Sequence, residues 1–147
     1  MRWRTIDRID AFEPWTSISG TKAISFEEGA LLERFGRDGE YPFTLIVEGC
    51  AEAARWLVEA SSGFESICLL AGIDSFQMRE RLETGDCIQV SVAISERTED
   101  ALVALCRIEK RGRIIGSGTI SLVLANLGEH CDPGCEASLW RELHGKP

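Results

Sequence analysis

Residues 42–60 predict a helix that is apolar around most of its circumference. Pro42 suits the first turn of a helix, and Ser61-Ser62-Gly63 is typical of a helix end. Between them, small and apolar side chains occupy most positions: Leu45, Ile46, Val47, Gly49, Cys50, Ala51, Ala53, Ala54, Trp56, Leu57 and Val58. Such a helix is stable only when protein covers most of its sides. The rest of the chain must therefore supply that cover.

Segments with a β-strand pattern lie on both sides of this helix. Residues 5–12 and 15–25, separated by Glu13-Pro14, are predicted to form a hairpin. Four further strands are expected after the helix, at residues 64–73, 87–95, 101–110 and 113–125. Turns at 97–99 and 111–112 make the last three an antiparallel meander. The predicted class is α+β, a single curved antiparallel sheet wrapped around one central helix, with a second copy able to cover the remaining faces.

The chain length and charge limit the organisation and the partners. We expect one domain over residues 1–125 and a tail over 126–147 that ends in a short helix near 137–144. A net charge of −8 argues against nucleic acid or an anionic membrane as a partner. The charged N-terminus does not resemble a secretory signal, and no uncharged run is long enough to span a membrane. The expected location is the cytoplasm.

The cysteine pattern predicts free thiols and no metal centre. Without an export signal, the six cysteines are expected to be reduced, and the four in apolar segments to be buried: Cys50, Cys68, Cys87 and Cys106. His130, Cys131 and Cys135 are close in sequence, but a structural zinc site normally needs four ligands at recognisable spacing. A solvated tail is the alternative interpretation of these three residues. We expect no metal and no cofactor.

The charged residues of the predicted helix form one stripe with two possible meanings. The stripe consists of Glu48, Glu52, Arg55 and Glu59. Spacings of three and four residues place them on one face, where Arg55 can pair with Glu52 or Glu59, and a solvated face is the common reason for this spacing. The small residues around Gly49 favour another reason, close approach of backbone or a ligand. Glu48 would then be partly desolvated, which suits a carboxyl group to acid–base chemistry.

Several stretches together resemble a known family. They are TIDRI at 5–9, PFTLIVEGCAEAA at 42–54, AGID at 71–74 and GD at 85–86. In this order, over residues 5 to about 125, they resemble the bacterial 3-hydroxyacyl-[acyl-carrier-protein] dehydratases. The resemblance implies the hotdog fold, a strongly curved antiparallel sheet around a central helix, in a dimer or larger assembly.

The resemblance also implies an active site between two subunits. In the family, an acyl-pantetheine thioester lies in a tunnel, a loop His removes the α-proton, and a helix carboxylate of the partner chain assists departure of the 3-hydroxyl as water. Glu48 matches that carboxylate. The family His stands fourteen residues earlier, where this chain has Arg34. Because Arg stays protonated, Arg34 cannot act as a general base.

At the other motif positions, this sequence matches the family's residues only in part. Phe35 follows Arg34 as the pattern requires, whereas Phe43 replaces a Gly at the helix start and Glu52 stands where a Gln is usual. We expect Glu48 to be the catalytic residue and four residues to bind substrate: Arg34, Phe35, Phe43 and Glu52. Both histidines of the chain, His130 and His144, lie in the tail and would reach the site only if the tail folded back over it.

Three functions remain open on this evidence, all involving acyl thioesters on acyl carrier protein or coenzyme A in fatty-acid or polyketide-type metabolism. The first is a divergent dehydratase, a lyase, in which Glu48 acts alone or a His comes from a related partner chain in a heterodimer. The second is a thioesterase in which Glu48 activates water. The third is a non-catalytic acyl binder or structural subunit. An acidic carrier protein would need a local positive patch, for which Arg79 and Arg81 are candidates, although such charges also protect sheet edges.

Overall fold

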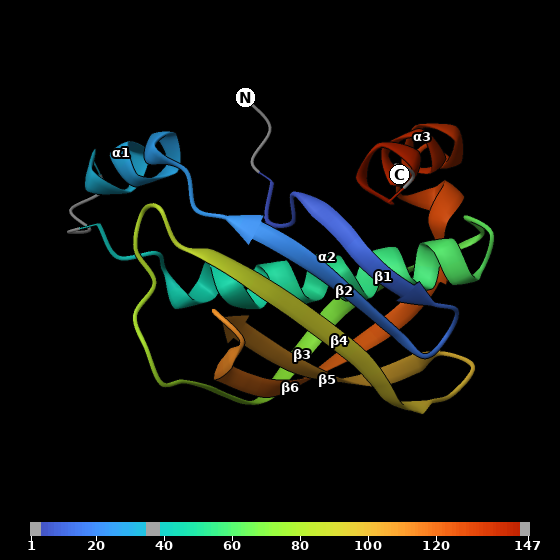
Figure 1. Ribbon diagram of the computed structural model, residues 1–147. Coiled ribbons are helices and arrows are strands. Elements are labelled where there is room, and N and C mark those ends of the chain that lie inside the picture. Colours follow the sequence, from blue (N-terminus) through green and yellow to red (C-terminus); the bar gives the residue numbers. More distant parts are fainter. Residues whose placement is uncertain (1–3, 35–38, 145–147) are drawn as a thin grey trace.

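Helix α2 (Phe43–Ser61) lies in the concave face of a six-stranded antiparallel sheet, as Figure 1 shows for this computed structural model. The structure describes residues 4–34 and 39–144. The strands are β1 (Arg8–Glu13), β2 (Ser17–Ala23), β3 (Ser66–Met78), β4 (Cys87–Arg97), β5 (Ala101–Lys110) and β6 (Arg113–Asn126). The remaining helices are α1 (Phe26–Arg34), the 3-10 turn η1 (Leu127–Glu129) and α3 (Pro133–His144). The predicted α+β hotdog architecture with one central helix is confirmed.

The strand order is β1-β2-β4-β5-β6-β3, so β1 and β3 form the two edges of the sheet. The predicted first hairpin and the β4–β5–β6 meander are both present. The turn between β5 and β6 places Arg111 and Gly112 at φ values of 52° and 76°, as a tight two-residue hairpin turn requires. Within the described residues, strand β3 pairs with β6 on one side only, and it carries three large exposed apolar side chains: Leu69, Leu70 and Ile73.

The apolar surface of α2 is buried as predicted. Trp56 is 1% exposed and Leu57 and Val58 are 0% exposed, because the strands wrap around the helix. The exposed residues of this helix are Phe43, Thr44 and Glu48, all in its first two turns. The helix is therefore covered along its length, and solvent reaches it chiefly near Glu48.

The small residues of α2 leave room for the chain's own N-terminal segment. A Cβ added at Gly49 would lie 3.4 Å from the Thr5 carbonyl oxygen, so the N-terminal backbone approaches this turn to within van der Waals contact. The sequence pattern predicted a close approach of backbone or a ligand at this turn, and the structure shows backbone. That approach brings Thr5 beside the helix face that carries Glu48 and Glu52.

Helix α1 was not predicted, and its start carries a capping box that was overlooked. The Ser25 hydroxyl accepts a hydrogen bond from the Glu28 backbone N–H at 3.2 Å, and the Glu28 carboxylate accepts one from the Ser25 N–H at 2.9 Å. This reciprocal pair satisfies two backbone donors that a helix start leaves free. The sequence signal was Ser25-Phe-Glu-Glu28.

The C-terminal segment belongs to the packed structure. Helix α3 starts at Pro133, earlier than predicted, and its Trp140 ring lies 6.0 Å from Trp56 and 5.1 Å from Phe12. Leu143 joins the same core. Figure 1 shows α3 at the opposite end of the molecule from α1. Among the described residues, no helix has both the length and the apolar character needed to cross a membrane.

Candidate functional site

A cavity of about 530 Å³ opens beside α2. Its walls come from the N-terminal segment, from α2, from the first half of β3 and from the segment after η1. The lining residues are Thr5, Glu48, Ala51, Glu52, Arg55, Ile67, Cys68, Leu69, Leu70, His130 and Cys131. The wall from α2 therefore carries ionisable side chains, and the wall from β3 is mainly apolar.

The charged stripe of α2 runs from solvent into the core. Glu48 is exposed, Glu52 and Arg55 are half-buried, and Glu59 is 0% exposed. A fully solvated face, one of the two interpretations of the spacing, is therefore wrong for Glu59. The stripe supplies three of the cavity residues, and among them Glu48 is the one open to solvent.

Glu52 joins α2 to the N-terminal segment. One carboxylate oxygen accepts hydrogen bonds from the Thr5 hydroxyl and from the Thr5 backbone N–H, the latter at 3.3 Å. The other oxygen accepts from the Trp56 indole N–H at 3.4 Å. These contacts fix the Glu52 side chain, so it shapes the cavity wall beside Glu48. Its predicted contact with substrate stays a prediction.

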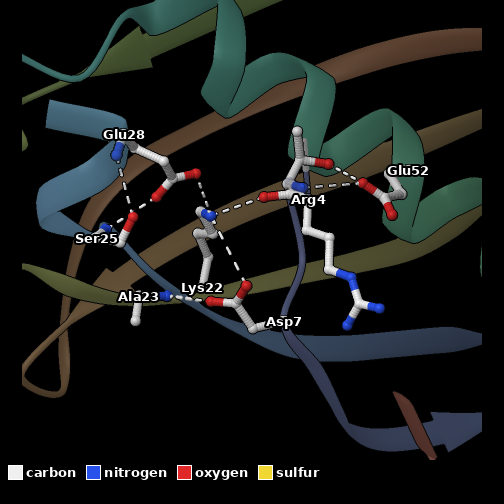
Figure 2. A network of polar contacts seen from close by, with 8 residues as sticks. Arg4, Asp7, Lys22, Ala23, Ser25, Glu28 and Glu52 are labelled. Carbon is white, nitrogen blue, oxygen red and sulfur yellow. Dashed lines mark hydrogen bonds and ion pairs between the residues drawn. The ribbon is translucent and has the colours of Figure 1, made fainter. Parts of the chain in front are cut away.

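A buried lysine holds the same N-terminal segment from the other side. Figure 2 shows the Lys22 ammonium, on β2, between the Arg4 carbonyl oxygen at 2.7 Å and the Glu28 carboxylate at 2.6 Å. The Asp7 carboxylate lies 3.8 Å away and also accepts a hydrogen bond from the Ala23 N–H. Lys22 is 3% exposed, so its charge is compensated almost entirely by these groups. The network positions the backbone that carries Thr5 into the cavity wall.

Arg55 links the cavity to a buried pair of carboxyl groups. Its guanidinium lies 3.4 Å from Glu59 on α2 and 4.0 Å from Glu136 on α3. Burial raises the pKa of Glu59 to about 8, Arg55 opposes the shift, and the facing Glu136 adds to it. Neither Glu59 oxygen has a hydrogen-bond partner among the described residues. One arginine thus serves two acids, and a neutral Glu59 is the form that burial favours.

His130 and Cys131 also line the cavity. Leu127, in η1, donates its backbone N–H to the Glu65 carbonyl oxygen at 2.9 Å, which anchors this segment beside the start of β3. The His130 backbone N–H in turn donates to the Leu127 carbonyl oxygen at 2.9 Å. These bonds hold the segment after β6 in place, so that His130 and Glu48 line the same cavity. His144 lies elsewhere, stacked on Trp140 with ring centroids 4.6 Å apart.

Arg34 and Phe43 do not line this cavity. Arg34 is exposed at the end of α1, and Phe35 lies outside the described residues. Phe43 is 43% exposed and packs edge-on against Phe76 at 5.3 Å. Of the predicted site residues that the structure describes, Glu48 and Glu52 alone are brought together, and the roles of Arg34, Phe35 and Phe43 stay predictions.

The candidate carrier-docking arginines are exposed but differ in their surroundings. Arg81 lies 3.6 Å from the Glu40 carboxylate, which partly neutralises it. Arg79 lines a groove of about 640 Å³ on strands of the sheet, together with Leu105, Arg107 and Ile114. Of the pair, Arg79 is therefore better placed to contribute to a positive patch.

The cysteines are free, as predicted, and three of the four expected to be buried are so: Cys50, Cys68 and Cys106. The prediction is wrong for Cys87, which begins β4 and is exposed. Within residues 4–34 and 39–144, no group of three or more His, Cys, Asp or Glu side chains is arranged to hold a metal ion.

Sequence comparison finds curated dehydratases. A 3-hydroxyacyl-[acyl-carrier-protein] dehydratase FabZ from Nitrosospira multiformis is 27% identical over 113 residues, covering 74% of this chain and 77% of the relative. The corresponding FabZ from Lactobacillus helveticus is 22% identical over 120 residues, covering 81% of each chain. No protein-family model matches the chain.

Structural comparison finds hotdog proteins. The dehydratase heterocomplex ApeI:P from Xenorhabdus doucetiae has a TM-score of 0.68 at 15% identity and covers 86% of each chain. A hot-dog-like protein from Thermanaerovibrio acidaminovorans has a TM-score of 0.65 at 11% identity, covering 92% of this chain and 96% of the other. The protein smu.793 from Streptococcus mutans, bound to acetyl CoA, has a TM-score of 0.64 at 12% identity, with coverage of 82% and 89%. These likenesses establish the fold.

Proposed function

Since this chain is a hotdog-fold member of the 3-hydroxyacyl-[acyl-carrier-protein] dehydratase family, we propose that it acts on acyl thioesters bound beside Glu48. The observation that carries the proposal is the cavity itself, which places an exposed carboxyl group opposite an apolar wall. Ile67, Leu69 and Leu70 offer that wall to an acyl chain. The reaction we favour is dehydration of 3-hydroxyacyl thioesters, with Glu48 acting on the 3-hydroxyl group.

A thioesterase is the second candidate. It is favoured by Arg34, the last residue of α1, which takes the sequence position of the family's catalytic His and cannot accept a proton. In that reaction, Glu48 activates a water molecule that attacks the thioester carbonyl, and free acid is released. The two reactions differ in their products, so one assay separates them.

The charges of the cavity favour an uncharged acyl group. Glu48 and Glu52 face it, and the one arginine of the lining, Arg55, is already engaged by Glu59 and Glu136. An acyl chain that ends in a carboxylate would meet repulsion with little compensation. The substrate class we propose is therefore a neutral 3-hydroxyacyl chain, carried on acyl carrier protein or coenzyme A, in fatty-acid or polyketide-type metabolism.

We propose that the active form is a dimer or larger assembly. Strand β3 is a sheet edge that leaves backbone groups unpaired on one side, and Leu69, Leu70 and Ile73 on it are between 39% and 51% exposed. Covering this edge with a second copy would pair the backbone groups and bury the apolar side chains. The same edge would serve a heterodimer with a related chain that carries the loop His.

The test of the proposed function is Glu48→Gln, which keeps the size of the side chain and removes its ability to exchange a proton. We expect at least about a 100-fold loss of turnover, because general acid–base catalysis typically contributes this much or more. Products from short- and medium-chain 3-hydroxyacyl thioesters, on coenzyme A and on carrier protein, are followed by mass spectrometry. Loss of water identifies dehydration and free acid identifies hydrolysis.

The matched control is Glu65→Gln, an exposed glutamate outside the cavity. It is expected to leave turnover unchanged. Equal activity of the Glu48 and Glu65 variants would remove Glu48 from the chemistry. Unchanged substrate with the unmodified protein would refute both enzymatic candidates and leave acyl binding as the function.

Carrier docking gives a separate prediction. Replacing Arg79 and Arg81 together by Glu should weaken binding of an acidic carrier protein by about 10-fold or more, because docking of two acidic proteins needs a local positive patch. Isothermal titration calorimetry with acyl carrier protein measures the change in dissociation constant. Arg141→Glu, on the exposed side of α3, is the control. An affinity that does not differ between the variants would exclude the Arg79–Arg81 patch.

A further inference from the structure

We infer that His130 is the general base of the dehydration, supplied by the C-terminal segment in place of the missing loop histidine. The inference rests on the proposed function and adds a second catalytic residue to it. It follows from one juxtaposition, which brings His130 and Glu48 to the same cavity although they come from distant parts of the sequence.

The first support is the availability of the His130 ring. His130 is exposed, and its ring makes no hydrogen bond or ion pair with the described part of the chain. Its position is nevertheless defined, because its backbone N–H is held by Leu127 and Leu127 by Glu65. A ring that is free to accept a proton and stands on an anchored backbone meets the requirement for a general base.

The second support is that the other cavity residues are unsuited to this step. Arg55 stays protonated, and Glu52 is held by Thr5 and Trp56. Glu48 is suited to one proton transfer, but elimination needs both a group that removes the α-proton and a group that protonates the leaving oxygen. Within the cavity, His130 is the residue with an imidazole ring, whose unprotonated nitrogen can take a proton from carbon and pass it on.

The proposed step balances without a further reactant. The unprotonated ring nitrogen of His130 takes the proton from C2, and the electron pair of that C–H bond forms the C2=C3 double bond. The C3–O bond breaks, and the leaving oxygen takes the proton of the Glu48 carboxylic acid and departs as water. Both side chains are exposed, so exchange with solvent returns the imidazolium and the carboxylate to their starting forms.

His130→Ala tests the inference, and the chain offers a matched control. We expect His130→Ala to lower kcat for dehydration by at least about 100-fold with KM little changed. Added imidazole should restore part of the rate, because a free base can enter the space that the side chain leaves. His144→Ala removes the other histidine, which stacks on Trp140 outside the cavity, and is expected to keep full turnover. Circular dichroism and thermal melting confirm that both variants are folded.

The outcomes separate the inference from the proposed function. If the unmodified protein dehydrates the substrate and His130→Ala does so equally well, the inference is overturned and the proposed function stands. A loss that appears only in KM, or that imidazole does not relieve, also refutes a base role. If the unmodified protein releases free acid only, or does not react, the inference fails together with dehydration.

Discussion

Replacing Lys22 by Met is expected to lower the free energy of unfolding by about 3–5 kcal/mol, because one partner of a buried ion pair is removed. The Glu28 carboxylate, 7% exposed, would keep its charge without the ammonium 2.6 Å away, and the Arg4 carbonyl oxygen would lose its donor. Urea denaturation followed by circular dichroism measures the change. We also expect lower turnover at conditions where the protein remains folded, because the network holds the segment that carries Thr5 into the cavity wall.

Arg113→Met is the control for the Lys22 prediction. Arg113 pairs with Glu80, but its side chain is 70% exposed, so its loss should change stability by less than about 1 kcal/mol. The double variant Lys22→Met with Glu28→Gln should recover part of the loss, since it removes the unpaired charge. Equal stability of the Lys22 and Arg113 single variants would mean that the buried network does not stabilise the fold.

The architecture was predictable because the sequence carries two strong patterns, the helical spacing of apolar residues in α2 and the alternation of apolar residues in the strands. Helix α2 is apolar over most of its surface, and the bounds of β5 agree with the pattern of its residues. Helix α1 was missed because its nine residues have no clear apolar face. Its capping box at Ser25 and Glu28 was the local signal that could have revealed it.

The site was predictable only where it depends on local sequence. Glu48 stands out by its place on α2 and lines the cavity, but the partial desolvation expected for it is wrong, because its side chain is exposed. The position of His130 follows from the path of the chain after β6 and the packing of α3, and no short-range pattern encodes either. The buried network around Lys22 is equally long-range, because strand periodicity does not distinguish a buried lysine with partners from a solvated one.

Glu59 shows most clearly that local sequence patterns do not encode long-range burial. The helix spacing allowed Arg55 to pair with Glu52 or with Glu59, and the structure contains the Glu59 pair at 3.4 Å. The burial of Glu59 could not be read from the helix, because the cover comes partly from α3, whose Glu136 reaches the same arginine. Helix α3 thus places a second buried carboxyl group, that of Glu136, beside the Arg55 guanidinium that already pairs with Glu59.

Stability of the unmodified protein is expected to fall as pH rises from about 4.5 to about 8, because burial raises the pKa of Glu59 from 4.5 to about 8. In this window the folded state keeps a proton that the unfolded state has lost, so the stabilisation is present below pH 4.5 and is lost by pH 8. Its full size is on the order of 5 kcal/mol as an upper bound. The groups facing Glu59 are Arg55, Glu136, Glu52 and Cys68.

Glu59→Gln isolates this effect, because a neutral amide stands in for the protonated carboxyl group at every pH. The variant should match the unmodified protein near pH 5 and exceed it in stability by several kcal/mol near pH 9, in urea unfolding at a series of pH values. Glu65→Gln, at an exposed position, should follow the curve of the unmodified protein. Parallel curves for the Glu59 variant and the unmodified protein would show that Glu59 is ionised when buried. In that case the Arg55 guanidinium, 3.4 Å away, would compensate the charge of Glu59 in the folded state.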